Sequence, residues 1–227
     1  MKNNPTCDAR IVESWHRNAV PWAAAVRAQR IESRRLVTDR AIIDAVRSRA
    51  PRSLIDLGCG EGWLIRALAG SVAHMIGVDV VPALIDAAAA AGGSEFHVAS
   101  YESIAAGDFQ FTADLVVCNF SLLGKESVEA TFAAVPRLLK PGGAFVVQTL
   151  HPIAACGEAP YRDGWRVGSW AGFSDEFCDP APWYFRTLGA WVQLYRSSGL
   201  RLLELREPSY PSGGQPASVI FVADVMR

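Results

Sequence analysis

Three glycines at alternate positions follow a short apolar run within residues 54–63. The run carries an acid, Asp56, and the glycines are Gly58, Gly60 and Gly62. Glycine adopts backbone angles that other residues avoid and lets the main chain approach a ligand, while a helix start offers unpaired N–H donors. The pattern predicts a strand that turns into a helix, with the polar groups of a cofactor held at the turn.

A second acid, Asp79, ends the next apolar run about 19 residues after Gly60. At this offset, a carboxylate accepts both hydroxyl groups of an adenosine ribose in nucleotide-binding folds. The alternative is a solvated acid at the end of a strand. The dinucleotide fingerprint G-x-G-x-x-G needs a small third residue where this chain has Trp63, which disfavours a pyrophosphate site.

Short apolar runs alternate with helical patterns between residues 53 and 150, which predicts βα units and a parallel sheet. The predicted strands are residues 53–57, 74–80, 95–99, 113–120 and 144–150. The predicted helices are residues 63–68, 82–91 and 126–139, the last with a kink at Pro136. We expect a single domain, because the chain is long enough for one sizeable core.

The segments on either side of this core have different patterns. Residues 1–50 are predicted to form a helical cover and residues 51–150 the cofactor-binding core. Residues 151–185 are rich in glycine, proline and aromatic residues, which predicts an ordered insertion. Residues 186–227 are predicted to form a C-terminal helix and a pair of strands. The helix is expected to begin slightly earlier, at about residue 183, and to end at about residue 198, and the strands are expected at residues 201–207 and 218–225.

Together these features resemble the class I S-adenosylmethionine-dependent methyltransferases that act on small molecules. The family motif D-x-G-x-G-x-G matches Asp56 and the three glycines, and the resemblance continues through Asp79, the segment DLVVCNFSLL and the turn LLKPGG. It implies an α/β, Rossmann-like fold with a seven-stranded, mostly parallel sheet and helices on both faces. The implied cofactor is S-adenosylmethionine, and the implied product is S-adenosylhomocysteine.

The resemblance also implies roles for the residues of the motif. Gly58, Gly60 and Gly62 are expected to hold the methionine part of the cofactor, and Asp79 its ribose. Asp56 is expected to order the loop or to reach the ammonium group of the cofactor.

Further roles follow from the next strands along the chain. Ser100 and Tyr101, with Glu102, are expected beside the adenine, although the family more often has an acid or asparagine at this point. Asn119 and Phe120 are expected beneath the sulfonium.

His151 is the candidate general base, because it directly follows the fifth predicted strand, at the edge where ligands bind in such sheets. The alternative is a structural histidine that hydrogen-bonds the backbone of a loop. The aromatic insertion beyond it is expected to form a lid or pocket wall over a small, partly apolar acceptor, or else a satellite core or a dimer contact.

The arginines of the N-terminal segment also have two interpretations. Arg30, Arg34, Arg35 and Arg40 are interpreted as a solvated helix face, or one of them, or the adjacent Glu32 or Ser33, covers the polar end of the ligand. Trp15 and Trp22 are interpreted as packing residues.

Composition sets limits on the protein's partners. The net charge of −1 and pI of about 6.4 suggest no affinity for nucleic acid or for an anionic membrane. The five cysteines show no metal-binding spacing, and no stretch is typical of a signal peptide or a membrane span. We therefore expect a cytoplasmic protein without a metal, as a monomer or homodimer, with a small-molecule acceptor as its partner.

Two alternatives to a methyltransferase remain open from the residues alone. One is a nicotinamide-dependent oxidoreductase, which Trp63 disfavours. The other is a non-catalytic module that binds an adenosine cofactor, which would keep the glycine loop but lack an acceptor cavity.

Overall fold

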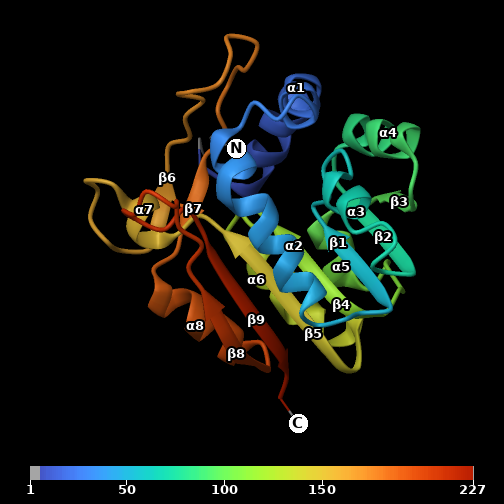
Figure 1. The fold of residues 1–227 in the computed structure, drawn as a ribbon. Helices are drawn as coiled ribbons and strands as arrows, with labels where there is room; N and C mark the ends of the chain where they lie inside the picture. Colours follow the sequence, from blue (N-terminus) through green and yellow to red (C-terminus); the bar gives the residue numbers. More distant parts are fainter. Residues whose placement is uncertain (1–5, 227) are drawn as a thin grey trace.

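Seven strands form one sheet in the order β3-β2-β1-β4-β5-β9-β8 in a computed structural model that describes residues 6–226 (Figure 1). The strands are β1 (Ser53–Leu57), β2 (His74–Asp79), β3 (Glu95–Val98), β4 (Ala113–Asn119), β5 (Leu139–Thr149), β8 (Leu200–Arg206) and β9 (Val219–Val225). The first five pair in parallel, and β9 runs antiparallel to both of its neighbours. This topology confirms the predicted α/β fold with a mostly parallel sheet.

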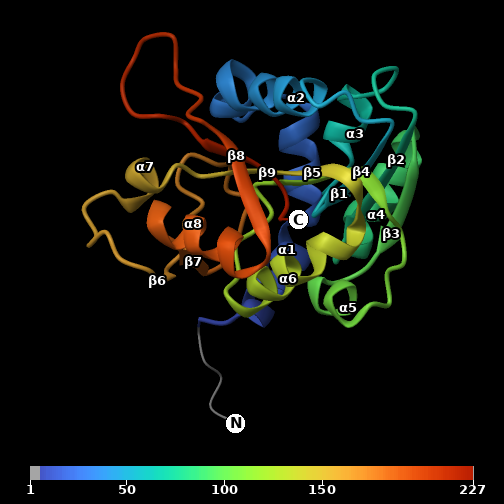
Figure 2. The same ribbon diagram turned by 90° about the horizontal axis from the view of Figure 1, so that it is seen from below.

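Helices cover both faces of the sheet (Figure 2). The helices are α1 (Asp8–Arg27), the π-helix η1 (Arg34–Thr38), α2 (Asp39–Arg47), α3 (Trp63–Ala67), α4 (Pro82–Ala91), α5 (Tyr101–Ala106), α6 (Glu126–Leu138), α7 (Pro152–Cys156) and α8 (Leu188–Ser197). One core cluster joins the sheet to α5, α6 and α8, and a second joins it to α2 and α3. None of the helices within the described residues is long and apolar enough to cross a membrane.

Successive residues of the central strands point into the two core clusters in turn. In β5, Phe145 and Val147 pack toward α6 and α8, whereas Val146 packs toward α2 and α3. This alternation follows from the two-residue period of a strand, and burial on both sides explains why the strands appear in the sequence as continuous apolar runs. Phe132 of α6 fixes one face through edge contacts with Phe145 and Tyr195, whose ring centroids lie 5.2 and 4.8 Å away.

The predicted helix at residues 183–198 is wrong over its first turn. Trp183–Phe185 forms β7, which pairs with β6 (Gly164–Arg166) in a separate two-stranded sheet, and α8 begins only at Leu188. A row of three aromatic residues favours an extended strand, and here Tyr184 packs edge-on against Trp165 at 5.6 Å. Thr187 then caps α8 by accepting a hydrogen bond from the Ala190 N–H.

The N-terminal helix and the insertion meet at the carboxyl-end edge of the sheet. In Figure 1, α1 (dark blue) stands beside the orange loop that joins β6 and β7. α1 also packs on α4, so one side of this helix contacts the cofactor-binding core and another contacts the insertion. This edge is where ligands bind in parallel sheets.

Candidate functional site

One cavity of about 410 Å³ lies at this edge, which is a volume typical of small-molecule sites. Its walls come from the segments that follow β1, β2, β3, β4 and β5, together with α1, residues 31–34 and the insertion. Of the residues predicted to bind the cofactor or to catalyse, eight line it: Gly58, Gly60, Asp79, Ser100, Tyr101, Glu102, Asn119 and Phe120. Asp56 and Gly62 lie behind the wall, and His151 lies outside it.

The glycine loop needs glycine for two separate reasons. Gly58, Gly60 and Gly62 all have left-handed backbone angles, with φ of +78°, +58° and +78°. At Gly58 a Cβ atom would also lie only 2.3 Å from the Cβ of Ser121. Any side chain there would push the chain after β4 away from the chain after β1, so the floor of the cavity depends on this close approach.

Asp79 fixes the loop from the neighbouring strand. Its carboxylate accepts hydrogen bonds from the backbone N–H groups of Gly60 and Val81, both at 2.9 Å. Burial raises the pKa of Asp79, while these N–H groups oppose the rise. A carboxylate has about four acceptor positions, so Asp79 keeps free lone pairs toward the cavity that it lines.

Asp56 lies beneath the loop and is almost completely inaccessible to solvent. Its Oδ1 atom accepts no hydrogen bond within the described residues. Burial raises the pKa of Asp56 to about 8, and the nearby negative charge of Asp79 adds to the rise. The negative charge of Asp79 therefore adds to burial in favouring the neutral form of Asp56.

Ser100 and Tyr101 have structural contacts as well as their places in the cavity wall. Ser100 caps α5 by accepting a hydrogen bond from the Ser103 N–H at 3.1 Å. The Tyr101 hydroxyl donates toward the carbonyl oxygens of Leu57 and Ser121, each at 3.3 Å. Tyr101 thus joins the loops after β1 and β4, and its ring forms the wall between them.

The chain after β4 turns sharply at Phe120, which has a positive φ of 53°. Such an angle is unusual for a large side chain and costs of the order of 1–3 kcal/mol. The Phe120 N–H nevertheless keeps a 2.8 Å hydrogen bond to the carbonyl of Gln148 on β5. Oδ1 of the adjacent Asn119 is buried and accepts no hydrogen bond from the described residues, so it remains available to a ligand in the cavity.

Glu61, between the second and third glycines, is a residue of this region that sequence reasoning missed. Its side chain has no solvent access and binds two arginines: Arg66 of α3 at 2.5 and 2.7 Å, and Arg27 of α1 at 2.9 Å. Arg27 also donates to the Ala87 carbonyl of α4. The available signal was an acid inside the glycine loop, followed five residues later by an arginine of opposite charge.

Trp15 and Trp22 do more than the packing assigned to them. They contact each other edge-on at 5.1 Å and both line the cavity. From the insertion, Trp170, Phe173 and Trp183 line it as well. The ring centroid of Trp170 lies 5.8 Å from that of Trp15, and the ring centroid of Phe173 lies 6.3 Å from that of Trp22. Two segments that are distant in the sequence, α1 and the insertion, therefore share one aromatic wall.

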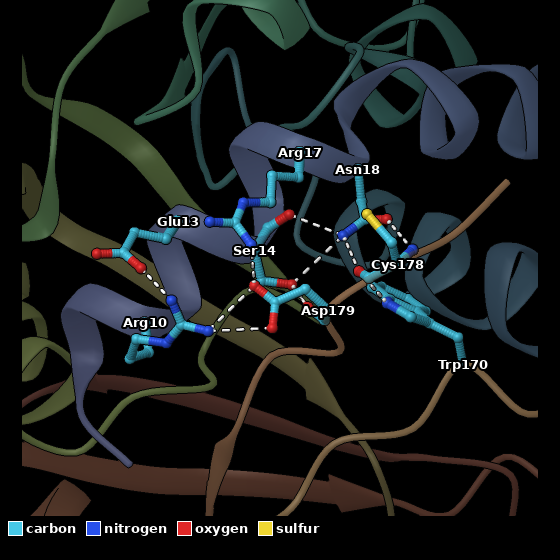
Figure 3. A network of polar contacts seen from close by, with 8 residues as sticks. All are labelled: Arg10, Glu13, Ser14, Arg17, Asn18, Trp170, Cys178 and Asp179. Atoms are coloured by element: carbon cyan, nitrogen blue, oxygen red, sulfur yellow. Dashed lines mark hydrogen bonds and ion pairs between the residues drawn. The ribbon is translucent and has the colours of Figure 1, made fainter. Parts of the chain in front are cut away.

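Polar contacts hold the two segments of this wall together (Figure 3). The Asp179 carboxylate accepts two hydrogen bonds from Arg10 at 3.0 Å and one from Arg17 at 2.7 Å. Asn18, which is fully buried, donates to the Cys178 carbonyl at 2.7 Å and accepts from the Cys178 N–H at 2.9 Å. We call these contacts between α1 and residues 178–179 the seam.

His151 has partners for both of its ring nitrogens. Nδ1 accepts the Ile153 N–H at 3.2 Å, which caps α7, and Nε2 lies 2.8 Å from Glu207. With Nδ1 as an acceptor, Nε2 carries the proton and donates it to Glu207. The ring is buried, and it is its neighbours Thr149 and Leu150 that line the cavity. The role of general base stays a prediction.

Arg34 is the only cationic side chain that lines the cavity in the described part of the chain. Its guanidinium stacks on the ring of Trp63, 4.3 Å from the ring centroid, and Nε pairs with Asp39 at 2.9 Å. Ser33 lines the cavity beside it, whereas Arg30, Arg35 and Arg40 do not. Arg34 therefore fits the interpretation in which one of these arginines covers the polar end of the ligand.

In the wild type, we expect the free energy of unfolding to fall as the pH rises, because Asp56 must lose its proton while buried. We predict that the Asp56→Asn variant, which keeps the shape of the side chain, lacks this fall. In the wild type, the folded pKa of about 8 exceeds the ordinary 3.8, so the folded state holds a proton that the unfolded state has lost. Stability should fall between about pH 4 and pH 8 by at most about 1.4 kcal/mol per unit. Denaturant unfolding of both proteins across this range measures it, and a pH-independent difference would contradict it.

Among the described residues, no cluster of three or more histidine, cysteine or acidic side chains is arranged to hold a metal.

Comparison with known proteins identifies the family of this chain. A family model described as "Methyltransferase domain" matches residues 28–205 of this chain. The matched segment contains the glycine loop, the carboxyl ends of β1 to β5 and the insertion.

Curated relatives are about a third identical to this chain within an aligned segment that spans about half of it. A malonyl-[acyl-carrier protein] O-methyltransferase of Hahella chejuensis is 31% identical over 115 residues, which are 48% of this chain and 40% of the relative. A ubiquinone biosynthesis O-methyltransferase of Xylella fastidiosa is 31% identical over 117 residues, 48% of this chain and 47% of the relative. The matches thus span about half the length of these relatives.

Solved structures share the fold. An S-adenosylmethionine-dependent methyltransferase from Mesorhizobium loti superposes with a TM-score of 0.61 over 81% of this chain and 95% of the other, at 23% identity. The fold and the family model agree with the resemblance found in the motif of the glycine loop. The chain belongs to the methyltransferase domain family, within the class I S-adenosylmethionine-dependent methyltransferases.

Proposed function

We propose that this protein transfers a methyl group from S-adenosylmethionine to a small, partly apolar acceptor. The observation that carries the proposal is that one cavity has the glycine loop and Asp79, with Trp22 over the loop, at one end and the aromatic rings of the insertion at the other. Methyl transfer brings two molecules together in line, and a cavity with two such ends can hold both. Neither the nicotinamide alternative nor the non-catalytic module gains support from the comparisons.

The residues present fit the cofactor. The close approach at Gly58 leaves backbone rather than side chain facing a ligand, and Asn119 offers an unpartnered buried acceptor. Asp79 has lone pairs left for the ribose hydroxyls, while Asp56 lies below the loop, where it orders the loop or reaches a cationic ammonium. When bound, S-adenosylmethionine supplies a methyl group on a positively charged sulfur.

Arg34 is the residue we propose for the cofactor's carboxylate. The methionine part carries a carboxylate, and Arg34 is the only cation of the described cavity lining. Stacking on Trp63 and pairing with Asp39 use Nε and one terminal nitrogen, which leaves Nη1 free to donate. Ser33 and the indole of Trp22, which lies over Gly60, line the cavity nearby.

The protein's part in the reaction is alignment and exclusion of water. The loops after β1 and β4 fix the donor end, while α1 and the insertion enclose the acceptor end. Such a displacement needs few catalytic side chains, since effective alignment alone removes a large part of the barrier. His151 is our candidate for proton removal, a role that requires Nδ1 to give up the Ile153 N–H.

The function as a whole is tested by incubating the purified protein with S-adenosylmethionine and pools of small metabolites. Release of S-adenosylhomocysteine that depends on a metabolite supports the proposal. Calorimetry should show binding of S-adenosylmethionine, and its absence would overturn the proposal.

For Asp79→Ala we expect weaker cofactor binding, because the variant loses hydrogen bonds between a charged carboxylate and the ribose. Such bonds contribute roughly 1.5–3 kcal/mol, so the Kd should rise about ten- to a hundredfold. The matched control is Asp86→Ala, an exposed acid on α4 that does not line the cavity. Unchanged affinity for S-adenosylmethionine in a folded Asp79→Ala variant would refute the ribose assignment.

Arg34→Ala should remove the preference for a cofactor that carries a carboxylate. We expect the wild type to bind S-adenosylmethionine about tenfold or more tightly than decarboxylated S-adenosylmethionine, and the variant to bind the two about equally. Arg35→Ala, one residue along on the exposed side of the π-helix, should keep the wild-type preference. If Arg34→Ala also keeps that preference, Arg34 does not bind the carboxylate.

His151→Ala should lower kcat about a hundredfold and leave the Kd for S-adenosylmethionine within about twofold, if His151 removes a proton. A general base also produces an acidic limb in the pH profile of kcat, which the variant should lose. Glu207→Gln, which keeps the ring in place with an uncharged partner, should retain that limb. A limb that persists in His151→Ala would assign His151 to the structure of the loop.

A further inference from the structure

The aromatic wall and its surroundings specify the chemistry of the acceptor. We propose that the acceptor is a flat, uncharged aromatic ring compound, held against the rings that the insertion contributes to the cavity. The inference rests on the proposed function, because the methyl donor must occupy the end of the cavity that contains the glycine loop and Asp79.

The first observation is the continuity of the rings. Trp170 and Phe173 contact each other with ring centroids 5.4 Å apart and reach Trp15 and Trp22 of α1 at 5.8 and 6.3 Å, and Trp183 lines the cavity from β7. Trp22 itself lies over Gly60, at the cofactor end. Aromatic faces and edges attract other aromatic rings more strongly than they attract saturated rings of equal size. A flat ring is therefore the shape that gains most from this wall.

The second observation is that the wall is fixed in place before a ligand binds. The seam holds residues 178–179 against α1 through Arg10, Arg17 and Asn18, and the Trp170 Nε1–H donates to the Cys178 carbonyl at 3.0 Å (Figure 3). Rings that are already ordered lose little conformational entropy on binding. The wall is thus suited to select shape rather than to adapt to many shapes.

The third observation is the absence of an available charge at this end within residues 6–226. The acid here is Asp8, whose two carboxylate oxygens accept the N–H groups of Lys125 and Ser127 at 2.9 and 2.6 Å, at the start of α6. The one cation of the described lining, Arg34, stacks on Trp63 at the cofactor end. An acceptor with a carboxylate or phosphate would lose its hydration here without gaining a counter-charge.

Three probes with the same two-ring skeleton separate flatness from charge. 2-Naphthol is flat and uncharged, 6-hydroxy-2-naphthoate adds a carboxylate, and decahydro-2-naphthol is uncharged but not flat. With the protein saturated with S-adenosylhomocysteine, we expect calorimetry to show 2-naphthol binding about tenfold or more tightly than either of the others. Equal or tighter binding of the naphthoate or of the saturated alcohol would overturn the proposal.

Matched variants locate the binding to the wall. Trp183→Leu should weaken 2-naphthol binding about fivefold or more, whereas Trp165→Leu, on the paired strand of the same small sheet but outside the cavity, should change it less than about twofold. Phe173→Leu is a second variant of the wall, should Trp183→Leu fail to fold. Unchanged 2-naphthol binding in the folded wall variants would overturn the proposal.

The same titrations separate the two levels of inference. If S-adenosylhomocysteine itself does not bind, the proposed function fails and the acceptor class falls with it. If S-adenosylhomocysteine binds but the probes show no preference for 2-naphthol, only the acceptor class is overturned.

Discussion

The site depends on the ion pairs that the buried carboxylate of Glu61 makes with two arginines. This carboxylate lies within the glycine loop, has no access to solvent, and is held by Arg66 of α3 and Arg27 of α1. Removing one partner of such a pair typically costs about 3–5 kcal/mol, because a charge is left buried without compensation. One acid thus fixes the turn after β1, the start of α3 and the end of α1, and through Arg27 it also reaches α4.

The cavity joins two kinds of structure. Its cofactor end is built from the ends of paired strands, where Asp79, Tyr101 and the Phe120 turn are fixed by backbone hydrogen bonds of the core. Its acceptor end is built from the first half of α1 and the insertion, which lie outside the sheet and contact each other through side chains. A change in the insertion can therefore alter the acceptor wall without disturbing the strands that form the cofactor end.

The sequence was sufficient for the parts of this protein that local patterns determine. The apolar runs of the parallel strands, the glycine loop and Asp79 each follow from residue type and spacing, and the fold agrees with them. Eight of the eleven predicted site residues line the cavity for the same reason, because they lie at or just after the ends of strands.

What the sequence could not predict depends on contacts between distant segments. Trp15 and Trp22 carry no local signal that separates a packing residue from a wall residue, since that depends on where Trp170 and Phe173 come to lie. His151 follows a strand as expected, but its ring contacts Glu207 and the Ile153 N–H and does not line the cavity. The strand Trp183–Phe185 exists because it has β6 as a partner, which periodicity alone does not reveal.

The seam also has a consequence for how the chain folds. Its hydrogen bonds join residues 160 to 169 positions apart, such as Asn18 with Cys178 and Arg10 with Asp179. Closing so long a loop costs entropy that a few polar contacts do not repay by themselves, so the sheet must first bring the two segments together. We therefore expect the aromatic wall to be completed only after the parallel strands have paired.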